Sequence, residues 1–113
     1  MNYKAKVIRI VDGDTLEATI DLGFSIFYTA MIRIYGINAP EMKGESKPLG
    51  EKSKARLKEL LEGKDVTVEY KCNDKYGRRV AVIILDDKNI GDIMIQEGLA
   101  ETFMVSRYKY SDD

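Results

Sequence analysis

The first third of the chain alternates short apolar runs with turn residues. Apolar and β-branched residues dominate 7–11, 15–20 and 26–35, and these runs are expected to form strands. The runs are separated by Asp12-Gly13-Asp14 and by 21–23, which carry the aspartate and glycine typical of tight turns. Three strands joined by such short connections predict an antiparallel meander at the start of the domain.

A helix is expected over 48–62, after a polar loop that begins at Asn38. Pro48 suits the first turn of a helix, and Gly63 is placed to end it. The apolar positions repeat with helical spacing, and small Ser53 fills a gap in the stripe that they form. This expected stripe consists of Leu49, Ala55, Leu57, Leu60 and Leu61.

The remaining pattern predicts two more strands and a short helix. Residues 65–72 alternate between apolar and polar positions, and one face of this strand should carry Val66, Val68 and Tyr70. A polar turn then leads to an apolar strand over 80–85. Asn89 is a good N-cap for a short helix over 91–97, which Gly98 would end.

The order of elements is therefore three strands, a helix, two strands and a short helix. This order predicts an OB-fold, a five-stranded Greek-key barrel with a helix between its third and fourth strands. The fold class is α+β, mainly β, with a single domain over 1–113. OB-folds often bind oligonucleotides, but a fold alone does not assign a function.

Composition removes several kinds of chemistry. The chain contains no histidine, which excludes Ser-His-Asp and Cys-His nucleophile systems, histidine-ligated zinc and histidine general bases. A metal would be bound mainly by oxygen, which suits Ca²⁺ or Mg²⁺. The net charge of −1 and the sequence pI of about 5.6 also argue against a generally basic nucleic-acid-binding surface.

Two further features concern the environment of the protein. The single cysteine, Cys72, cannot form a disulfide within the chain and is expected to be a small buried hydrophobe of a strand. The N-terminus has no apolar segment typical of a signal peptide, and no stretch is long enough to span a membrane. We therefore expect a cytoplasmic protein, although the mature form of a secreted protein would look the same.

Three polar clusters are candidates for chemistry, and the first is Asp12-Gly13-Asp14-Thr15, between the first two expected strands. Most such turns are only structural, but two carboxylates separated by one glycine can also converge on a hard cation. The second cluster is Arg33 with Asn38-Ala39-Pro40-Glu41. Arg33 interrupts an apolar strand, so it lies either on the solvent face or buried and paired. A paired arginine is a candidate for holding phosphate.

The third cluster is the sequence from Asp74 to Arg79, which is either an ordinary charged hairpin or a turn that binds phosphate and stacks a tyrosine. Together the three clusters contain metal-binding carboxylates, a carboxylate base and arginines. These are the groups needed for phosphodiester hydrolysis without histidine.

In three ordered motifs the chain resembles the staphylococcal nuclease family. The motifs are 11–15 (VDGDT), 32–41 (IRIYGINAPE) and 74–78 (DKYGR), and the similarity continues through 50–55 (GEKSKA) and 96–100 (QEGLA). It therefore covers nearly the whole chain, and it implies the same OB-type barrel that the pattern predicts.

The resemblance also implies a Ca²⁺-dependent nuclease that cleaves DNA and RNA with little base preference and leaves 3′-phosphate ends. By position, Asp14, Asn38 and the backbone carbonyl of Ala39 would hold the metal. Glu41 would be the general base, or the group that orients the attacking water. The scissile phosphate and its transition state would be held by Arg33 and Arg78.

Other positions receive supporting roles from the same resemblance. Lys75 and Tyr76 would contact the other phosphate and the sugar of the nucleotide, and Asp12 would lie near the metal without binding it. The expected partner is a DNA or RNA substrate. We expect no membrane partner, and we expect a monomer.

Two departures from the family pattern affect these expectations. Asn38 replaces a carboxylate with a neutral amide, so Ca²⁺ should bind more weakly. The family's third helix has no counterpart in 106–113. Met104 and Ser106 stand where tyrosines of the best-known member pack on the base, with Tyr108 and Tyr110 as candidates to replace them. The alternative function is a catalytically weak or inactive OB-fold module that binds single-stranded nucleic acid or protein.

Overall fold

The computed structural model describes residues 1–103 of the 113-residue chain. The expected C-terminal positions, from Met104 to Tyr110, therefore lie outside the described residues. The strands are β1 Asn2–Asp12, β2 Thr15–Asp21, β3 Phe27–Ile34, β4 Ile37–Asn38, β5 Asp65–Asn73, β6 Arg79–Leu85, β7 Lys88–Asn89 and β8 Glu101–Thr102. The helices are the 3-10 turn η1 Gly44–Ser46, α1 Lys47–Leu61 and α2 Ile90–Gln96.

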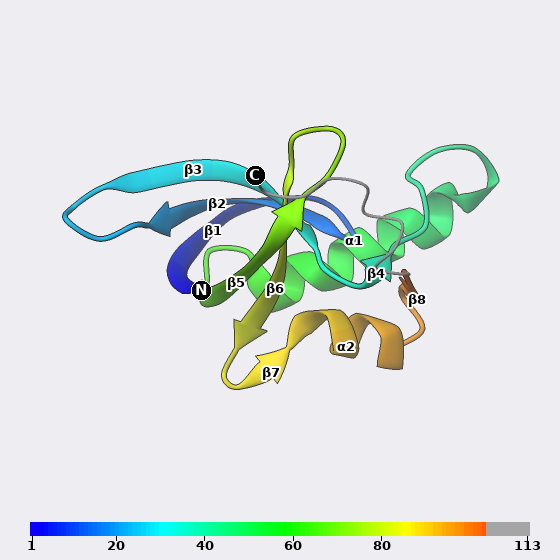
Figure 1. The fold of residues 1–113 in the computed structure, drawn as a ribbon. Coiled ribbons are helices and arrows are strands. Elements are labelled where there is room, and N and C mark those ends of the chain that lie inside the picture. Colours follow the sequence, from blue (N-terminus) through cyan, green and yellow to red (C-terminus); the bar gives the residue numbers. More distant parts are fainter. Residues whose placement is uncertain (104–113) are drawn as a thin grey trace.

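Five of the strands close into a barrel (Figure 1). The meander β1–β2–β3 is antiparallel, β1 also pairs with β5, and β5 pairs with β6. A short parallel pairing closes the circle, because Ile32, Arg33 and Ile34 of β3 lie beside Arg79, Val80 and Ala81 of β6. The predicted five-stranded barrel, mainly β with one long and one short helix, is confirmed.

Period-two alternation fills the barrel with apolar side chains. Leu16, Ala18 and Ile20 of β2 are buried, as are Ala30, Ile32 and Ile34 of β3, while the residues between them are more exposed. Both helices extend this core, through Leu57 and Leu61 of α1 and through Ile90 and Met94 of α2. The core is therefore one continuous cluster shared by the barrel and its two helices.

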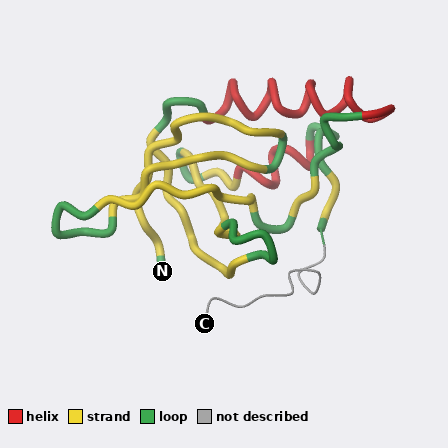
Figure 2. Tube along the Cα trace, turned by 90° about the horizontal axis from the view of Figure 1, so that it is seen from above, coloured by secondary structure: helices red, strands yellow, loops and turns green. Residues whose placement is uncertain are grey.

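The helices occupy one side of the molecule and the β2–β3 hairpin the other. Figures 1 and 2 show the hairpin tip and the N-terminal end of α1 at opposite ends. After α1, Gly63 adopts a left-handed conformation with φ +75°, and its N–H donates to the carbonyl of Val7 at 3.0 Å. This contact ties the end of the helix to β1. Among the described residues, no helix is both long and apolar enough to cross a membrane.

The predicted apolar stripe of the long helix is partly wrong. Leu49 is 60% exposed and Ala55 is also exposed, whereas Leu57 and Leu61 are buried as expected and Leu60 packs against the core. The buried face of the first turns consists of Gly50 and Ser53 instead. Small residues are needed there because α1 lies directly against the preceding loop: a Cβ atom at Gly50 would stand 2.5 Å from the carbonyl oxygen of Glu41.

Other differences concern strands that local pattern did not reveal. β1 begins at Asn2 rather than at residue 7, because residues 2–6 pair with residues 65–69 of β5. Three two-residue strands, β4, β7 and β8, lie within segments expected to be loops or caps. In contrast, the predicted helix cap is confirmed, since the Asn89 side chain accepts a hydrogen bond from the N–H of Asp92 at 3.2 Å.

The corrected stripe yields a stability prediction. Leu57→Ala should lower the free energy of unfolding by about 2–5 kcal/mol, because it opens a cavity in the shared core. Leu49→Ala should change it by no more than about 0.5 kcal/mol, because that side chain is mostly in water already. Urea unfolding of both variants beside the parent protein measures the difference. Equal losses for the two leucines would contradict the orientation of α1.

Candidate active site

The turn between β1 and β2 holds a buried carboxylate. The backbone N–H of Asp14 donates to Oδ1 of Asp12 at 3.1 Å, which shapes the turn. The Asp14 side chain is buried, and its Oδ1 accepts from the Thr15 hydroxyl at 2.9 Å. Its Oδ2 accepts from the backbone N–H of Ala39 at 2.8 Å, which ties this turn to the segment after β4.

Glycine is needed in this turn for space. A Cβ atom at Gly13 would overlap the Ser53 side chain of α1 and would lie 2.7 Å from the Cβ of Ala39. Ser53 itself is fully buried and donates from its hydroxyl to the carbonyl of Leu99 at 2.8 Å. The small residues at 13, 39 and 53 therefore let the turn, the segment after β4 and the helix meet in one place.

Arg33 is buried and paired, one of the two alternatives open from the sequence. Its side chain is 11% exposed, and Nη2 donates to the carbonyl of Ile37 at 3.1 Å and to Oδ1 of Asn38 at 3.2 Å. Nη1 lies 4.0 Å from Oδ2 of Asp14. The guanidinium also stacks on Phe103, 4.7 Å from the ring centroid.

The turn between β5 and β6 positions the second arginine. Oδ2 of Asp74 accepts from Nε of Arg78 at 2.6 Å, while its Oδ1 accepts from the backbone N–H groups of Tyr76 and Arg78 at 2.9 and 3.0 Å. Nη1 of Arg78 reaches the Thr15 hydroxyl at 3.5 Å. Since the Asp74 side chain is only 8% exposed, it is a well-shielded anchor for this arginine.

Four of the predicted site residues, Asp14, Arg33, Asn38 and Arg78, lie close together in a cluster around Thr15. The Thr15 hydroxyl contacts both Asp14 and Arg78, and Thr15 stands directly opposite Arg33 in the β2–β3 register. Asn38 joins the cluster through its hydrogen bond with Arg33. Two arginines, one buried carboxylate and one amide oxygen thus share a region built from three separate connections of the barrel.

Three predicted residues lie at the edge of this cluster or outside it. Lys75 and Tyr76 are exposed, with the Lys75 ammonium 5.3 Å and the Arg78 guanidinium 5.2 Å from the centre of the Tyr76 ring. Glu41 is exposed, and its backbone carbonyl accepts from the Ser46 hydroxyl at 2.8 Å. Within residues 1–103, the structure does not tie the Glu41 carboxylate to the cluster.

Two functional contacts were not found by sequence reasoning. Phe103 lies below Arg33 because its N–H donates to the carbonyl of Gly36 at 2.8 Å, next to the short β4–β8 pairing. Asp74 is the first residue of the 74–78 motif, but the motif alone did not indicate that it anchors Arg78. An acidic residue four positions before an arginine in a turn is a weak signal for such anchoring, whereas nothing local points to Phe103.

The carboxylates of the first turn are electrostatically strained. Burial, together with the neighbouring Asp14 carboxylate, raises the pKa of Asp12 from its ordinary 3.8 to about 6. No group of three or more Asp, Glu, His or Cys residues forms a metal cluster within the described part of the chain. The available donors are the Asp14 carboxylate, the Asn38 amide oxygen and the backbone carbonyl of Ala39, with the Asp12 carboxylate close by. This all-oxygen set, with two close carboxylates, fits a hard divalent cation.

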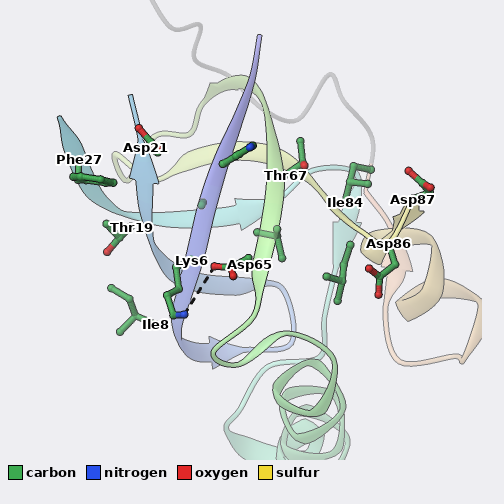
Figure 3. A pocket seen from close by; sticks show the side chains of 14 residues that line it. Lys6, Ile8, Thr19, Asp21, Phe27, Asp65, Thr67, Ile84, Asp86 and Asp87 are labelled. Atoms are coloured by element: carbon green, nitrogen blue, oxygen red, sulfur yellow. Dashed lines mark ion pairs between the residues drawn. The ribbon is translucent and has the colours of Figure 1, made fainter. Parts of the chain in front are cut away.

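A larger hollow lies away from these residues. A groove of about 840 Å³ runs over the outer face of the barrel, lined among others by Lys6, Ile8, Phe27, Asp65 and Ile84 (Figure 3). Within it, Lys6 and Asp65, which are opposite each other in the β1–β5 register, form an ion pair at 3.9 Å. None of the residues predicted from the motifs lines this groove, so size alone does not locate the candidate site.

Comparisons with known proteins agree with the motifs. A family model described as "Staphylococcal nuclease homologue" matches residues 31–113. An uncharacterized endonuclease of Haemophilus influenzae is 34% identical over 108 residues, which cover 96% of this chain and 54% of that protein. The micrococcal nuclease of Shigella flexneri is 31% identical over 108 residues, covering 88% and 58%. Endonuclease YncB of Bacillus subtilis is 29% identical over 106 residues, covering 86% and 46%.

The chain therefore spans about half the length of the relatives that it matches. The family model covers most of the chain, and the Haemophilus protein matches nearly all of it at more than 30% identity. The resemblance drawn from the three motifs is confirmed, and the chain belongs to the staphylococcal nuclease family.

Proposed function

We propose that this protein is a Ca²⁺-dependent nuclease that hydrolyses DNA and/or RNA with low sequence specificity and leaves 3′-phosphate ends. The observation that carries the proposal is the convergence of Arg33, Arg78 and the buried Asp14 around Thr15. A barrel that served only as a scaffold would gain little from placing two arginines and a carboxylate together in a partly buried region.

The two arginines are proposed to hold the scissile phosphate and its transition state. Each is already oriented by protein groups, Arg33 by Ile37 and Asn38 and Arg78 by Asp74. Donors fixed before the substrate binds need no reorganisation as negative charge develops on the phosphate oxygens. The planar guanidinium is suited to this task because it can contact two oxygens at once.

The metal would be held by Asp14, Asn38 and the backbone carbonyl of Ala39, with Asp12 close by. When bound, Ca²⁺ would neutralise phosphate charge and favour ionisation of the attacking water. Asn38 contributes an oxygen but no charge, so weak Ca²⁺ binding is expected. The closeness of the Asp12 and Asp14 carboxylates supports the assignment, because a cation beside them would relieve their repulsion.

Glu41 is proposed to take a proton from the attacking water, or to orient that water. The water oxygen bonds to phosphorus as the bond from phosphorus to the 5′-oxygen breaks, and the phosphate stays on the 3′-oxygen. The departing 5′-oxygen takes a proton from solvent, and Glu41 returns its proton to solvent. The Glu41 side chain is exposed. Its backbone carbonyl accepts a hydrogen bond from Ser46 and packs closely against Gly50 of α1. The backbone that carries the Glu41 carboxylate is therefore held in place on both sides by neighbouring residues.

A second candidate is an OB-fold module that binds single-stranded nucleic acid without cutting it. It is favoured by the neutral Asn38 and by the absence, within the described residues, of a contact between the Glu41 carboxylate and the cluster. Incubating a fluorescent oligonucleotide with millimolar Ca²⁺ separates the two candidates. Cleavage that a chelator stops supports the nuclease, and binding without cleavage supports the module.

Glu41→Gln tests the proposed base. We expect the cleavage rate of single-stranded DNA to fall about 100- to 10,000-fold, because general base catalysis typically contributes that much. Thermal stability should not change, since the side chain is in water. Glu45→Gln, an exposed glutamate of the same loop, is the matched control and should cleave normally. Normal cleavage by the Glu41 variant would remove this residue from the mechanism.

Asn38→Asp tests the proposed metal site. The substitution adds one negative charge and keeps an oxygen that can accept from Arg33, so the Ca²⁺ concentration for half-maximal cleavage should fall on the order of tenfold. A Ca²⁺ titration of the cleavage rate measures this. Asn2→Asp adds the same charge at an exposed position at the start of β1 and should leave the titration unchanged. An unchanged or higher midpoint for the Asn38 variant argues against calcium at this position.

Asp74→Asn tests whether Asp74 positions Arg78. Hydrogen bonds to charged groups contribute about 1.5–3 kcal/mol, so kcat/KM should fall about 10- to 150-fold. If Asp74 acts through Arg78, the substitution should cost little more once Arg78→Ala is present. Rates are measured below the unfolding temperature of each variant. Independent, multiplying losses in the double variant would mean that Asp74 has a different role.

A further inference from the structure

A small pocket lies at one end of the barrel, on the inner face of the strands that carry the candidate site. It has a volume of about 140 Å³ and a floor of core side chains that includes Ile20, Ile32 and Ala81. Ile32 and Arg79 face each other across the closing β3–β6 edge. Since side chains alternate along β3, Arg33 lies on the opposite face of that strand from Ile32, which lines the pocket. Arg78 is in the turn that precedes β6, next to Arg79, which also lines the pocket.

The guanidinium of Arg79 lies at the rim of the pocket, surrounded by tyrosine side chains. Arg79 donates from Nη1 to Oδ1 of Asn73 at 2.7 Å and from Nη2 to the hydroxyl of Tyr28 at 3.0 Å. The same Asn73 oxygen accepts from the hydroxyl of Tyr70 at 2.8 Å. The guanidinium also lies 5.5 Å from the centre of the Tyr28 ring, and Tyr3 completes the aromatic lining.

This combination favours one class of ligand. The lining holds no acidic side chain, one arginine, three tyrosines and otherwise aliphatic groups. Tyrosine rings and arginine planes are the surfaces on which unpaired bases stack in single-stranded nucleic acid complexes. A cavity of about 150 Å³ accommodates a benzene-sized ring, so this pocket suits a single six-membered ring such as a pyrimidine.

We propose that the pocket binds one unpaired base of a single-stranded nucleic acid whose neighbouring phosphate lies at Arg33 and Arg78. The proposal rests on the proposed function for the position of that strand. Consecutive residues link the two sites: Ile32 and Arg33 within β3, and Arg78, which precedes β6, with Arg79, the first residue of β6. A strand that crosses the three-residue β3–β6 edge would therefore place its phosphate outside the barrel and a base inside the mouth.

The test compares Tyr28→Ala with Phe27→Ala. The two residues are adjacent exposed aromatics of β3, but Phe27 lies in the outer groove of Figure 3 and not in the pocket. Fluorescence anisotropy in a chelator measures the affinity of a labelled oligothymidylate of about eight nucleotides, within typical OB-fold site sizes, and of an abasic strand of the same length, which keeps the phosphates but has no bases. The chelator prevents metal-dependent cleavage, so the readout does not depend on catalysis.

The parent protein should bind the oligothymidylate more tightly than the abasic strand, because only the oligothymidylate can place a base in the pocket. Tyr28→Ala should weaken binding of the oligothymidylate about 5- to 150-fold, the range expected for one stacked base, while binding of the abasic strand is unaffected. Phe27→Ala should bind both strands as the parent protein does. Unchanged binding of the oligothymidylate by Tyr28→Ala, or an equal loss in Phe27→Ala, overturns the proposal, as does a failure of the parent protein to bind the oligothymidylate.

A direct measurement covers the case in which Tyr28→Ala fails to fold. Ring resonances of labelled tyrosines in the parent protein should shift for Tyr28 and Tyr70 when the oligothymidylate is added, but not when the abasic strand is added. Unchanged resonances overturn the proposal. Binding with these features but without cleavage in Ca²⁺ would instead contradict the proposed nuclease activity and leave the base pocket in place.

Discussion

The candidate site depends on the buried carboxylate of Asp14. Two hydrogen bonds from Thr15 and from the backbone of Ala39 satisfy this carboxylate, and Arg33 lies within ion-pair distance. A buried charge without such partners would be costly, so the fold requires the turn after β1 and the segment after β4 to meet here. Gly13 and Ser53 allow that meeting, because larger side chains would separate the turn from α1. The residues proposed to bind metal and phosphate are positioned by this one constraint.

Local charge balance explains how an acidic protein can present arginines to a phosphate. The net charge of −1 gives no general attraction to nucleic acid, yet Arg33 and Arg78 each stand in a place where their orientation is fixed. Asp74 neutralises much of the charge of Arg78 while aiming it, whereas Arg33 is paired mainly with neutral oxygens and an aromatic ring. The local electrostatic potential is therefore expected to be more positive at Arg33 than at Arg78. Asn38 contributes to this, because a carboxylate at position 38 would lower the potential beside Arg33.

Much of the barrel could be predicted from the sequence because its signals are local. Alternation in β2 and β3, the capping Asn89 and the glycine that ends α1 all act within a few residues. The predictions failed where contacts with segments distant in the sequence determine the local structure. Residues 2–6 become a strand only because β5 lies beside them, and Gly50 rather than Leu49 faces inward because the loop at Glu41 leaves no room for a side chain.

The same distinction applies to the candidate site. Asp14, Arg33 and Arg78 could be named from motifs, but their motifs do not say that Thr15 lies between them or that Phe103 supports Arg33. Those contacts depend on barrel closure, which brings β6 beside β3 through only three residues. Because side chains alternate along β3, neighbouring residues of this edge belong to two chemically different surfaces: Arg33 to the charged cluster outside and Ile32 to the tyrosine-lined mouth inside. In the proposed complex, the backbone of a nucleic-acid strand would lie on the first surface and one of its bases on the second.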